Sequence, residues 1–298
     1  MYDIIIIGAG PAGLTAALYA LRANKKIIIF EAKTFGGQII NASKIVNYPG
    51  IEEVSGFDYA TTLYNQVKKL GAEIKYETVL RVEKDKTVIT NKDKYKAKSV
   101  IIATGAENRK LNIDGENKFI GKGVSYCATC DGNFFKGMDV AVVGGGNTAI
   151  ADALYLSDIV NKVYLIHRRE EFRGEPKKVE ELKNKKNVEL VLNSNVVKIN
   201  GEDKVESIEV ENTSNERKTI NVSGIFIAVG QDPKNAIFNN IVELNDKGYI
   251  ISEDGVHTST EGIYVAGDTR EKVLRQLTTA VSDGSIAATI AIKEGKDK

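Results

Sequence analysis

The fold is decided by the stretch YDIIIIGAGPAGLTAALYALRANKKIIIFE, residues 2–31, and by its partial repeat MDVAVVGGGNTAIADALYLSDIVNKVYLIHRR, residues 138–169. When Gly8 is aligned with Gly144, the two copies stay in register without a gap as far as Tyr19 and Tyr155. Each copy has an apolar run, a glycine turn, a segment of helical periodicity and a second apolar run. This order predicts strand, turn, helix and strand, the opening unit of a dinucleotide-binding domain.

Both glycine turns have the spacing that binds a dinucleotide. The first turn carries Gly8, Gly10 and Gly13, and the second carries Gly144 and Gly146 with Ala149 in the third place. The first glycine permits a tight turn, the second lets the backbone approach a pyrophosphate, and the third small residue lets helix pack on strand. A plain glycine turn without a ligand is the simpler interpretation, but it does not account for two copies in full context.

The ends of the second strands distinguish the two ligands. Position 31, 23 residues after Gly8, is Glu, whereas position 167, 23 residues after Gly144, is His and is followed by Arg168 and Arg169. A carboxylate there binds ribose hydroxyls, so the first site predicts FAD or NAD. Arginines bind a 2′-phosphate, so the second site predicts NADPH, with Arg173 as a further partner. The alternative for these arginines is a solvated charged face, because glutamates are interspersed among them.

Further apolar runs indicate how the domains are connected. Residues 100–105 and 225–230 read as matching strands, and residues 262–268 read as a strand that ends on Asp268, followed by a helix over about 274–293. Asp268 could offer its carboxylate to a cofactor hydroxyl or simply cap a helix. The sequence therefore predicts an α/β protein with two Rossmann-like, three-layer domains. The first domain comprises residues 1–112 and 234–298, the second comprises residues 113–233, and a double linker joins them.

Cys127 and Cys130, in SYCATCDGNFF, are the two cysteines of the chain. A structural zinc ion needs four Cys or His ligands, and the two histidines stand in unrelated surroundings, so we predict no metal. A cross-link that closes so short a loop adds little stability. The pair therefore favours redox chemistry.

The composition excludes several classes of function. The 41 Lys and Arg residues nearly balance the 40 Asp and Glu residues, so no broad basic field for nucleic acid or membrane lipid is expected. Residues 4–7, an early apolar run, are too short for a signal peptide or a spanning helix. We therefore expect a cytoplasmic protein without nucleic-acid or membrane partners.

Motifs along nearly the whole chain resemble the low-molecular-weight thioredoxin reductases, a class of pyridine nucleotide-disulfide oxidoreductases. These motifs, in the family's order, are GAGPAGLTAA, GGQ at 36–38, NYPG at 47–50, ATG at 103–105, CATCDG at 127–132, GGGNTA at 144–149, HRREEFR at 167–173, AGD at 266–268 and RQ at 275–276. CATCDG between two nucleotide motifs is the most specific of them.

The resemblance implies a role for each matching residue. Cys130 would face the flavin, Cys127 would attack the substrate disulfide, and Asp131 would act as general acid and base, although an Asp-Gly pair also forms ordinary turns. FAD would be held by Gly8, Gly10, Pro11, Ala12, Gly13, Glu31, Gly36, Gly37, Gln38, Asn47, Thr104, Gly105, Gly267, Asp268, Arg275, Gln276 and Leu277. NADPH would be held by Gly144, Gly146, Asn147, Thr148, His167, Arg168, Arg169 and Arg173.

The implied function is that of a thioredoxin-disulfide reductase, a homodimer in this family. NADPH would reduce FAD by hydride transfer, FAD would reduce the Cys127–Cys130 disulfide, and the dithiol would reduce thioredoxin or a similar protein. The cysteines lie in the NADPH domain, whereas the flavin belongs to the other domain, so we expect domain rotation to couple the two half-reactions. Alternatives are a small-dithiol oxidase of the same fold, a ferredoxin-dependent relative, and a non-catalytic redox sensor that binds nucleotides.

Overall fold

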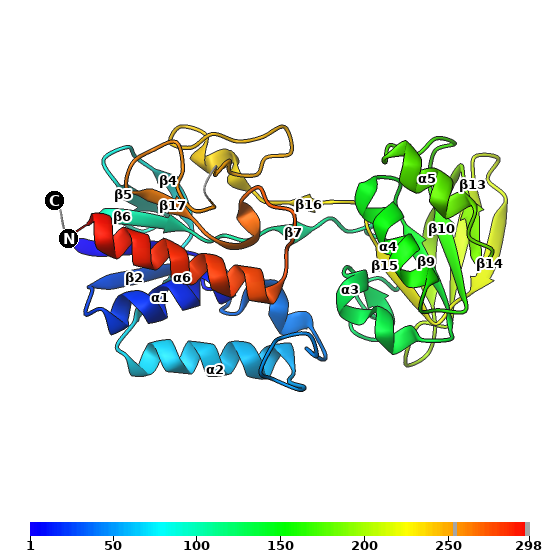
Figure 1. Ribbon diagram of the computed structural model, residues 1–298, viewed down its shortest axis with the longest axis horizontal. Coiled ribbons are helices and arrows are strands. Elements are labelled where there is room, and N and C mark those ends of the chain that lie inside the picture. Colours follow the sequence, from blue (N-terminus) through cyan, green and yellow to red (C-terminus); the bar gives the residue numbers. More distant parts are fainter. Residues whose placement is uncertain (253–254, 296–298) are drawn as a thin grey trace. The chain divides into compact units, whose positions relative to one another are not determined.

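Two compact units make up the chain in the computed structural model, which describes residues 1–252 and 255–295 (Figure 1). Unit 1 comprises Met1–Glu107 and Asp232–Lys298, and unit 2 comprises Asn108–Gln231. The sequence predicts the two boundaries between the domains after residues 112 and 233, a few residues later than the boundaries in the structure. The α/β class and the interrupted order of the expected fold are confirmed.

Unit 1 is built around one mixed sheet whose strands follow the order β3-β2-β1-β6-β5-β4, with β17 on β6. Its strands are β1 (Tyr2–Ile7), β2 (Ile27–Glu31), β3 (Glu73–Tyr76), β4 (Val79–Val82), β5 (Thr87–Thr90), β6 (Lys94–Ile102) and β17 (Ile263–Val265). Its helices are α1 (Pro11–Arg22), α2 (Gly56–Lys69) and α6 (Leu277–Glu294), with 3-10 turns η1 (Gly37–Asn41), η3 (Asn235–Phe238) and η4 (Gly267–Thr269).

The parallel part of this sheet separates two hydrophobic cores. Strand β1 pairs in parallel with β2 and β6, and β17 pairs in parallel with β6. Side chains alternate across each strand, so Ile4 and Ile6 point to one face and Ile5 and Ile7 to the other. On the first face α1 and α6 lie side by side (Figure 1). The strand order places the carboxyl ends of β1, β2, β6 and β17 at one edge, where ligands bind in such sheets.

Helix α6 begins later than the sequence predicts. The periodicity suggests a start near residue 274, whereas the helix begins at Leu277. Gln276 is its N-cap and shares a capping box with Thr279, so the backbone amides of these two residues are satisfied by each other's side chains.

Unit 2 repeats the same plan on a smaller scale. Its parallel sheet has the order β11-β10-β9-β15-β8, and a separate antiparallel sheet has the order β12-β13-β14. The strands are β8 (Val124–Ser125), β9 (Asp139–Val143), β10 (Lys162–Ile166), β11 (Val188–Val191), β12 (Ser194–Asn200), β13 (Ser207–Asn212), β14 (Arg217–Asn221) and β15 (Gly224–Ile227). The helices are α3 (Ala128–Asp131), α4 (Asn147–Ser157) and α5 (Pro176–Lys183), with the 3-10 turn η2 (Gly132–Phe135).

The layers of unit 2 follow from the two faces of its parallel sheet. Ala141 and Val143 pack against the three-stranded sheet, where Ile199 and Ile208 are buried. On the other face Val140 and Val142 pack with α4. The expected three-layer arrangement is thus present, with an antiparallel sheet as the third layer.

The two crossings of the chain pair with each other. They form the short strands β7 (Glu107–Asn108) and β16 (Gln231–Asp232), which hydrogen-bond as a two-stranded ribbon. The Arg109 amide donates to the Gly230 carbonyl at 3.0 Å, and the Gln231 side chain donates to Asn108 at 2.8 Å. The double linker is therefore an ordered ribbon of two strands.

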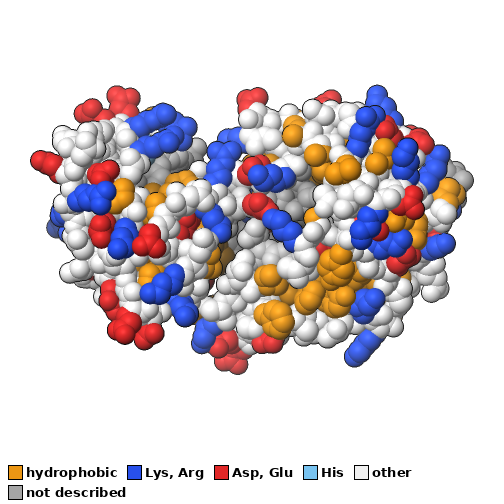
Figure 2. Space-filling model, turned by 180° about the vertical axis from the view of Figure 1, so that it is seen from behind, with side chains coloured by type: hydrophobic (Ala, Val, Ile, Leu, Met, Phe, Trp, Pro, Cys, Tyr) orange, Lys and Arg blue, Asp and Glu red, His pale blue; other side chains and the backbone are white. Residues whose placement is uncertain are grey.

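The surface carries both signs of charge. On the face shown in Figure 2, Lys and Arg side chains are interspersed with Asp and Glu side chains, and hydrophobic side chains gather over part of unit 1. Among the described residues, no helix combines the length and the apolar character that crossing a membrane requires.

Candidate active site

The glycine turn of unit 1 brings the sheet edge and helix α1 together. Gly8 has φ +107°, and a Cβ there would lie 2.3 Å from the Ala103 carbonyl oxygen. A Cβ at Gly13 would lie 1.9 Å from the carbonyl oxygen of Gly8. Only glycine fits these two positions, and the helix therefore starts directly above the end of β1.

The N-terminus of α1 is open. A Cβ at Gly10, the N-cap, would meet only the Cα of Gly37, at 3.9 Å. Among the described residues, no side chain caps this helix, so the amides of Ala12 and Gly13 have no intrahelical or capping partner. Open space and unpaired amides at a helix N-terminus fit a pyrophosphate.

Segments far apart in the sequence meet around this turn. The Gly36 amide donates to the Ala9 carbonyl at 2.8 Å, and the Thr104 and Thr269 hydroxyls lie 3.0 Å apart. A Cβ at Gly267 would lie 2.9 Å from the Cβ of Ala12. The predicted FAD residues that the structure brings to this edge are Gly8, Gly10, Pro11, Ala12, Gly13, Gly36, Gly37, Thr104, Gly267 and Asp268.

Three other predicted FAD residues form a second group. The Asn47 amide donates to the Gln276 side chain at 3.3 Å, although the residues are 229 positions apart. Leu277 follows Gln276 as the first residue of α6. Gln38 lies in η1 with its side chain exposed, and the hydrogen bond between Asn47 and Gln276 does not include it.

Glu31 lies at the end of β2, as predicted. Its Oε2 accepts the Ala9 amide and its Oε1 accepts the Lys33 amide, each at 2.8 Å. These bonds fix the carboxylate beside the glycine turn. A carboxylate held there can accept ribose hydroxyls.

Asp268 does not cap a helix. It lies inside η4, whose N-cap is Ala266, so the simple capping interpretation does not hold. Its Oδ1 is buried without a hydrogen bond from the described residues, and Lys272 Nζ forms an ion pair with it at 3.5 Å. Burial raises the pKa of this carboxyl group, while the charges of Lys272 and Arg275 oppose the rise. An unsatisfied buried oxygen is costly, and a cofactor hydroxyl would satisfy it.

Arg275 lies against the loop that carries Asp268, and its contact with FAD stays a prediction. Its guanidinium donates to the carbonyls of Asp268, Arg270 and Lys272 at 3.2–3.4 Å. It also lies 4.0 Å from the centroid of the Tyr249 ring. The guanidinium therefore braces the loop that carries Asp268.

The glycine turn of unit 2 repeats the geometry of the first. Gly144 has φ +150°, and a Cβ there would lie 2.5 Å from the Ala228 carbonyl oxygen. Ala149, in the third position, is fully buried against the turn. A Cβ at Gly146 meets no described atom within 4 Å, and among the described residues no side chain caps α4. The exposed Thr148 belongs to the same first turn.

The segment that follows β10, residues 167–175, is fastened to this turn. The His167 ring occupies the space above Gly145, where a Cβ would lie 2.1 Å from ring carbon Cε1. The Arg173 amide donates to the Gly145 carbonyl at 2.8 Å, and the Glu175 amide donates to the Asn147 side chain at 2.7 Å. We call residues 167–175 the arginine loop.

The cationic side chains of the arginine loop are available for a ligand. Arg168, Arg169 and Arg173 are exposed, and none of them forms an ion pair with a described residue. Glu175 instead pairs with Lys178 at 3.0 Å. These guanidinium groups are therefore exposed and carry no ion pair to the described glutamates interspersed among them.

His167 contributes to the loop as a buried ring. It is 4% exposed, its Nε2 lies 3.1 Å from the Glu171 carbonyl oxygen, and it stacks on Phe172. Burial lowers its pKa, and the arginines beside it lower it further. The ring therefore supports the loop as a neutral group, and a direct contact with NADPH stays a prediction.

The disulfide lies at the start of α3, between β8 and the second glycine turn. Cys127 and Cys130 are bonded to each other, and both are half-buried. The Ser125 hydroxyl donates to Asp131 Oδ2 at 2.6 Å and accepts the Cys127 amide at 3.1 Å. Burial raises the pKa of the Asp131 carboxyl group, and the bond from Ser125 opposes this rise. A carboxyl group with a raised pKa beside a disulfide is suited to exchange protons with thiols.

Comparisons with known proteins identify the family of the chain. A model of the pyridine nucleotide-disulphide oxidoreductase family matches residues 2–284. The chain belongs to this family. A thioredoxin reductase of Peptoclostridium acidaminophilum is 43% identical, over 98% of this chain and 96% of the relative. A solved thioredoxin reductase of Streptococcus pyogenes is 40% identical with a TM-score of 0.96, covering 100% of this chain and 99% of that one. The Lactococcus lactis thioredoxin reductase in its FR conformation is 38% identical, covers 100% of both chains and has a TM-score of 0.67.

These findings confirm the resemblance to thioredoxin reductases and the enzyme class. The chain is an NADPH-dependent flavoprotein disulfide reductase of the pyridine nucleotide-disulphide oxidoreductase family, with FAD and NADPH as cofactors. The two open glycine turns, the unsatisfied Asp268 oxygen and the unpaired arginines fit these groups.

Three residues that contact Asp131 or the loop of Asp268 are not identified from the sequence. Ser125 opens the motif SYCATCDG, but its sequence gives no sign that its hydroxyl binds Asp131. Lys272 and Asp283 form a buried ion pair at 3.0 Å below Asp268. An acidic residue in the alanine-rich buried stripe of α6 is the signal that could have indicated Asp283.

Proposed function

We propose that this protein is a thioredoxin-disulfide reductase that passes electrons from NADPH to thioredoxin or a thioredoxin-like protein. The Cys127–Cys130 disulfide, placed beside Asp131 in the same unit as the arginine loop, is the observation that carries the proposal. Relatives named thioredoxin reductase, alike over nearly the whole chain, support it.

The proposed mechanism assigns the following tasks to this chain. The open N-terminus of α1, Glu31 and Asp268 would hold FAD, and the turn at Gly144 with the arginine loop would hold NADPH. Bound FAD supplies the ability to accept a hydride and to return two electrons to a disulfide. The Cys127 thiolate then attacks the partner's disulfide, and Cys130 resolves the mixed disulfide.

Asp131 would hold the proton that this exchange requires. Reducing a disulfide to two thiols consumes two protons, and the carboxyl group of Asp131 lies next in sequence to Cys130. Its raised pKa lets it be protonated closer to neutral pH than an exposed aspartate. It can therefore donate to one thiolate and be reprotonated by solvent.

The direct test is a steady-state assay with NADPH and thioredoxin, each omitted in turn. Thioredoxin-dependent oxidation of NADPH is the expected result. Oxidation of a small dithiol by oxygen that needs neither NADPH nor thioredoxin would contradict the proposal and favour a dithiol oxidase. A purified protein without flavin absorption would favour the redox sensor.

The Ser125→Ala variant should shift the pH profile of disulfide reduction upward by about 1 unit. Losing a hydrogen bond to a charged group removes about 1.5 kcal/mol from the ionised form, and 1.36 kcal/mol corresponds to one pKa unit. The pKa of Asp131, already raised by burial, would rise further because the Ser125 hydroxyl no longer stabilises the carboxylate. The rate of thioredoxin reduction as a function of pH measures this shift.

A background without the carboxyl group provides the control. The double variant Asp131→Asn, Ser125→Ala should have the same pH profile of thioredoxin reduction as the single variant Asp131→Asn. An equal shift in both backgrounds would show that another group titrates, and the role of Asp131 would then be abandoned.

Domain rotation, which couples the half-reactions, is part of the proposal. Two solved relatives of similar identity match this chain with TM-scores of 0.96 and 0.67 at full coverage, which supports variable domain orientation within the family. Cross-linking the two units should permit a single half-reaction and stop multiple turnover. Cross-linked protein that turns over normally would refute rotation.

The homodimer and the cytoplasmic location expected from the sequence stay predictions. Light scattering on the FAD-loaded protein measures the oligomeric state, and a mass of one chain would contradict the dimer.

A further inference from the structure

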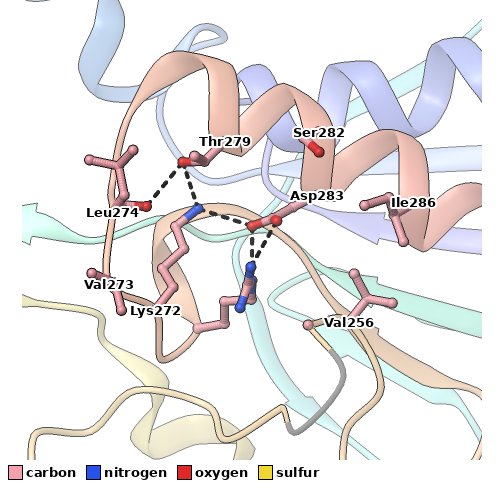
Figure 3. A pocket seen from close by; sticks show the side chains of 10 residues that line it. Val256, Lys272, Val273, Leu274, Thr279, Ser282, Asp283 and Ile286 are labelled. Atoms are coloured by element: carbon pink, nitrogen blue, oxygen red, sulfur yellow. Dashed lines mark hydrogen bonds and ion pairs between the residues drawn. The ribbon is translucent and has the colours of Figure 1, made fainter.

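A buried cluster of charged side chains includes Lys272 and Asp283 (Figure 3). It contacts the loop that carries Asp268. Asp283, on α6, has a side chain that is 6% exposed. Its two oxygens accept the Gly267 amide at 3.0 Å, the Arg270 guanidinium at 2.9 and 3.0 Å, and the Lys272 ammonium at 3.0 Å. One carboxylate thus receives hydrogen bonds from residues on both sides of Asp268.

Lys272 connects this carboxylate to Asp268. Its side chain is 5% exposed, and its ammonium also donates to the Thr279 hydroxyl at 3.1 Å. It lies 3.5 Å from the buried Oδ1 of Asp268. Figure 3 shows the ammonium between Thr279 and Asp283.

Cations outnumber carboxylates around Asp283 and Asp268, because Arg275 also lies beside the Asp268 backbone. Arg270 and Lys272 are two buried or half-buried cations, and Asp283 is one carboxylate. Asp268 supplies the second negative charge. Burying an unpaired charge is costly, so the cluster favours an ionised Asp268.

We propose that Asp283 and Lys272 are positioning residues, which hold the backbone and the carboxylate of Asp268 in place for FAD. Asp283 fixes the amide one residue before Asp268 and the guanidinium two residues after it. Lys272 holds the carboxylate by charge and leaves Oδ1 without a hydrogen bond. The inference rests on the proposed role of Asp268 at the FAD site.

FAD affinity of the flavin-free protein tests the inference. The dissociation constant for FAD, from flavin fluorescence, should rise by about tenfold in Asp283→Asn, because one charge-assisted hydrogen bond is worth about 1.5 kcal/mol. Lys272→Met should have a similar effect. Ser282→Ala, an exposed neighbour on the same helix, should bind FAD as the original protein does.

A double-mutant cycle separates positioning from general stabilisation. If Asp283 acts through Asp268, then Asp268→Asn combined with Asp283→Asn should weaken FAD binding no more than the more severe single variant. Unfolding of the flavin-free variants in urea reports stability independently. If Asp283→Asn fails to fold, the double-mutant cycle of Asp268→Asn with Lys272→Met tests the positioning role instead.

The outcomes distinguish this inference from the proposed function. Additive effects, or unchanged FAD affinity in both Asp283→Asn and Lys272→Met, would overturn the positioning role and leave the FAD site intact. Unchanged affinity in Asp268→Asn would overturn the assignment of Asp268 itself.

Discussion

Protein with Cys127→Ser is expected to reduce thioredoxin at least about 10⁴-fold more slowly than the original protein, because the attacking thiolate is gone. The same loss is expected in Cys130→Ser, since the mixed disulfide can no longer be resolved. The NADPH-dependent decrease in thioredoxin disulfide, followed with excess thioredoxin, measures both effects. The two half-buried cysteines are therefore each essential but for different reasons.

The two variants should differ in the species that they accumulate. Cys130→Ser keeps the attacking thiol of Cys127, so it should form a stable mixed disulfide with thioredoxin that a non-reducing gel detects. Cys127→Ser should not form this species. Flavin absorption should still decrease in both variants on addition of NADPH, which shows that the nucleotide site is intact. A mixed disulfide formed only by Cys127→Ser would reverse the assigned roles.

The second large effect concerns the choice of coenzyme. Replacing Arg168, Arg169 and Arg173 by Gln should raise the KM for NADPH by about 10²- to 10³-fold. Two to three charge-assisted hydrogen bonds at about 1.5 kcal/mol each sum to about 3–4.5 kcal/mol, and 1.4 kcal/mol corresponds to a factor of ten. The KM for NADH should change by less than about threefold, because NADH has no 2′-phosphate.

A charge on another part of unit 2 provides the matched control. Arg217→Gln removes an exposed guanidinium that pairs with Glu211 on the antiparallel sheet. Its KM for NADPH should stay unchanged. If the KM values for NADPH and NADH rise equally in the triple variant, the arginine loop does not bind the 2′-phosphate.

The sequence predicts the glycine turns of both nucleotide sites because the backbone geometry at these turns allows only certain residue types. Gly8 and Gly13 leave no room for a Cβ, and such positions can be recognised from spacing alone. Glu31 follows the same logic, since the end of β2 must face the turn after β1. The strand order of each sheet then follows from the connections.

Side-chain direction is what spacing does not determine. Arg275 turns toward the carbonyls of its own loop, and His167 turns inward over Gly145, although both occupy motif positions. Ser125 and Asp283 act through hydrogen bonds to residues that only the fold brings near them. The hydrogen-bond partners of these residues are set by tertiary packing, and a sequence motif does not specify them.

The ribbon of β7 and β16 brings together the two points at which the chain passes between unit 1 and unit 2. Because the two strands are paired, the inserted unit leaves and re-enters its host at neighbouring points. Insertions whose ends lie close together are tolerated without rerouting the host. Unit 2 therefore interrupts unit 1 between β6 and β17, while these two strands still pair with each other in one sheet.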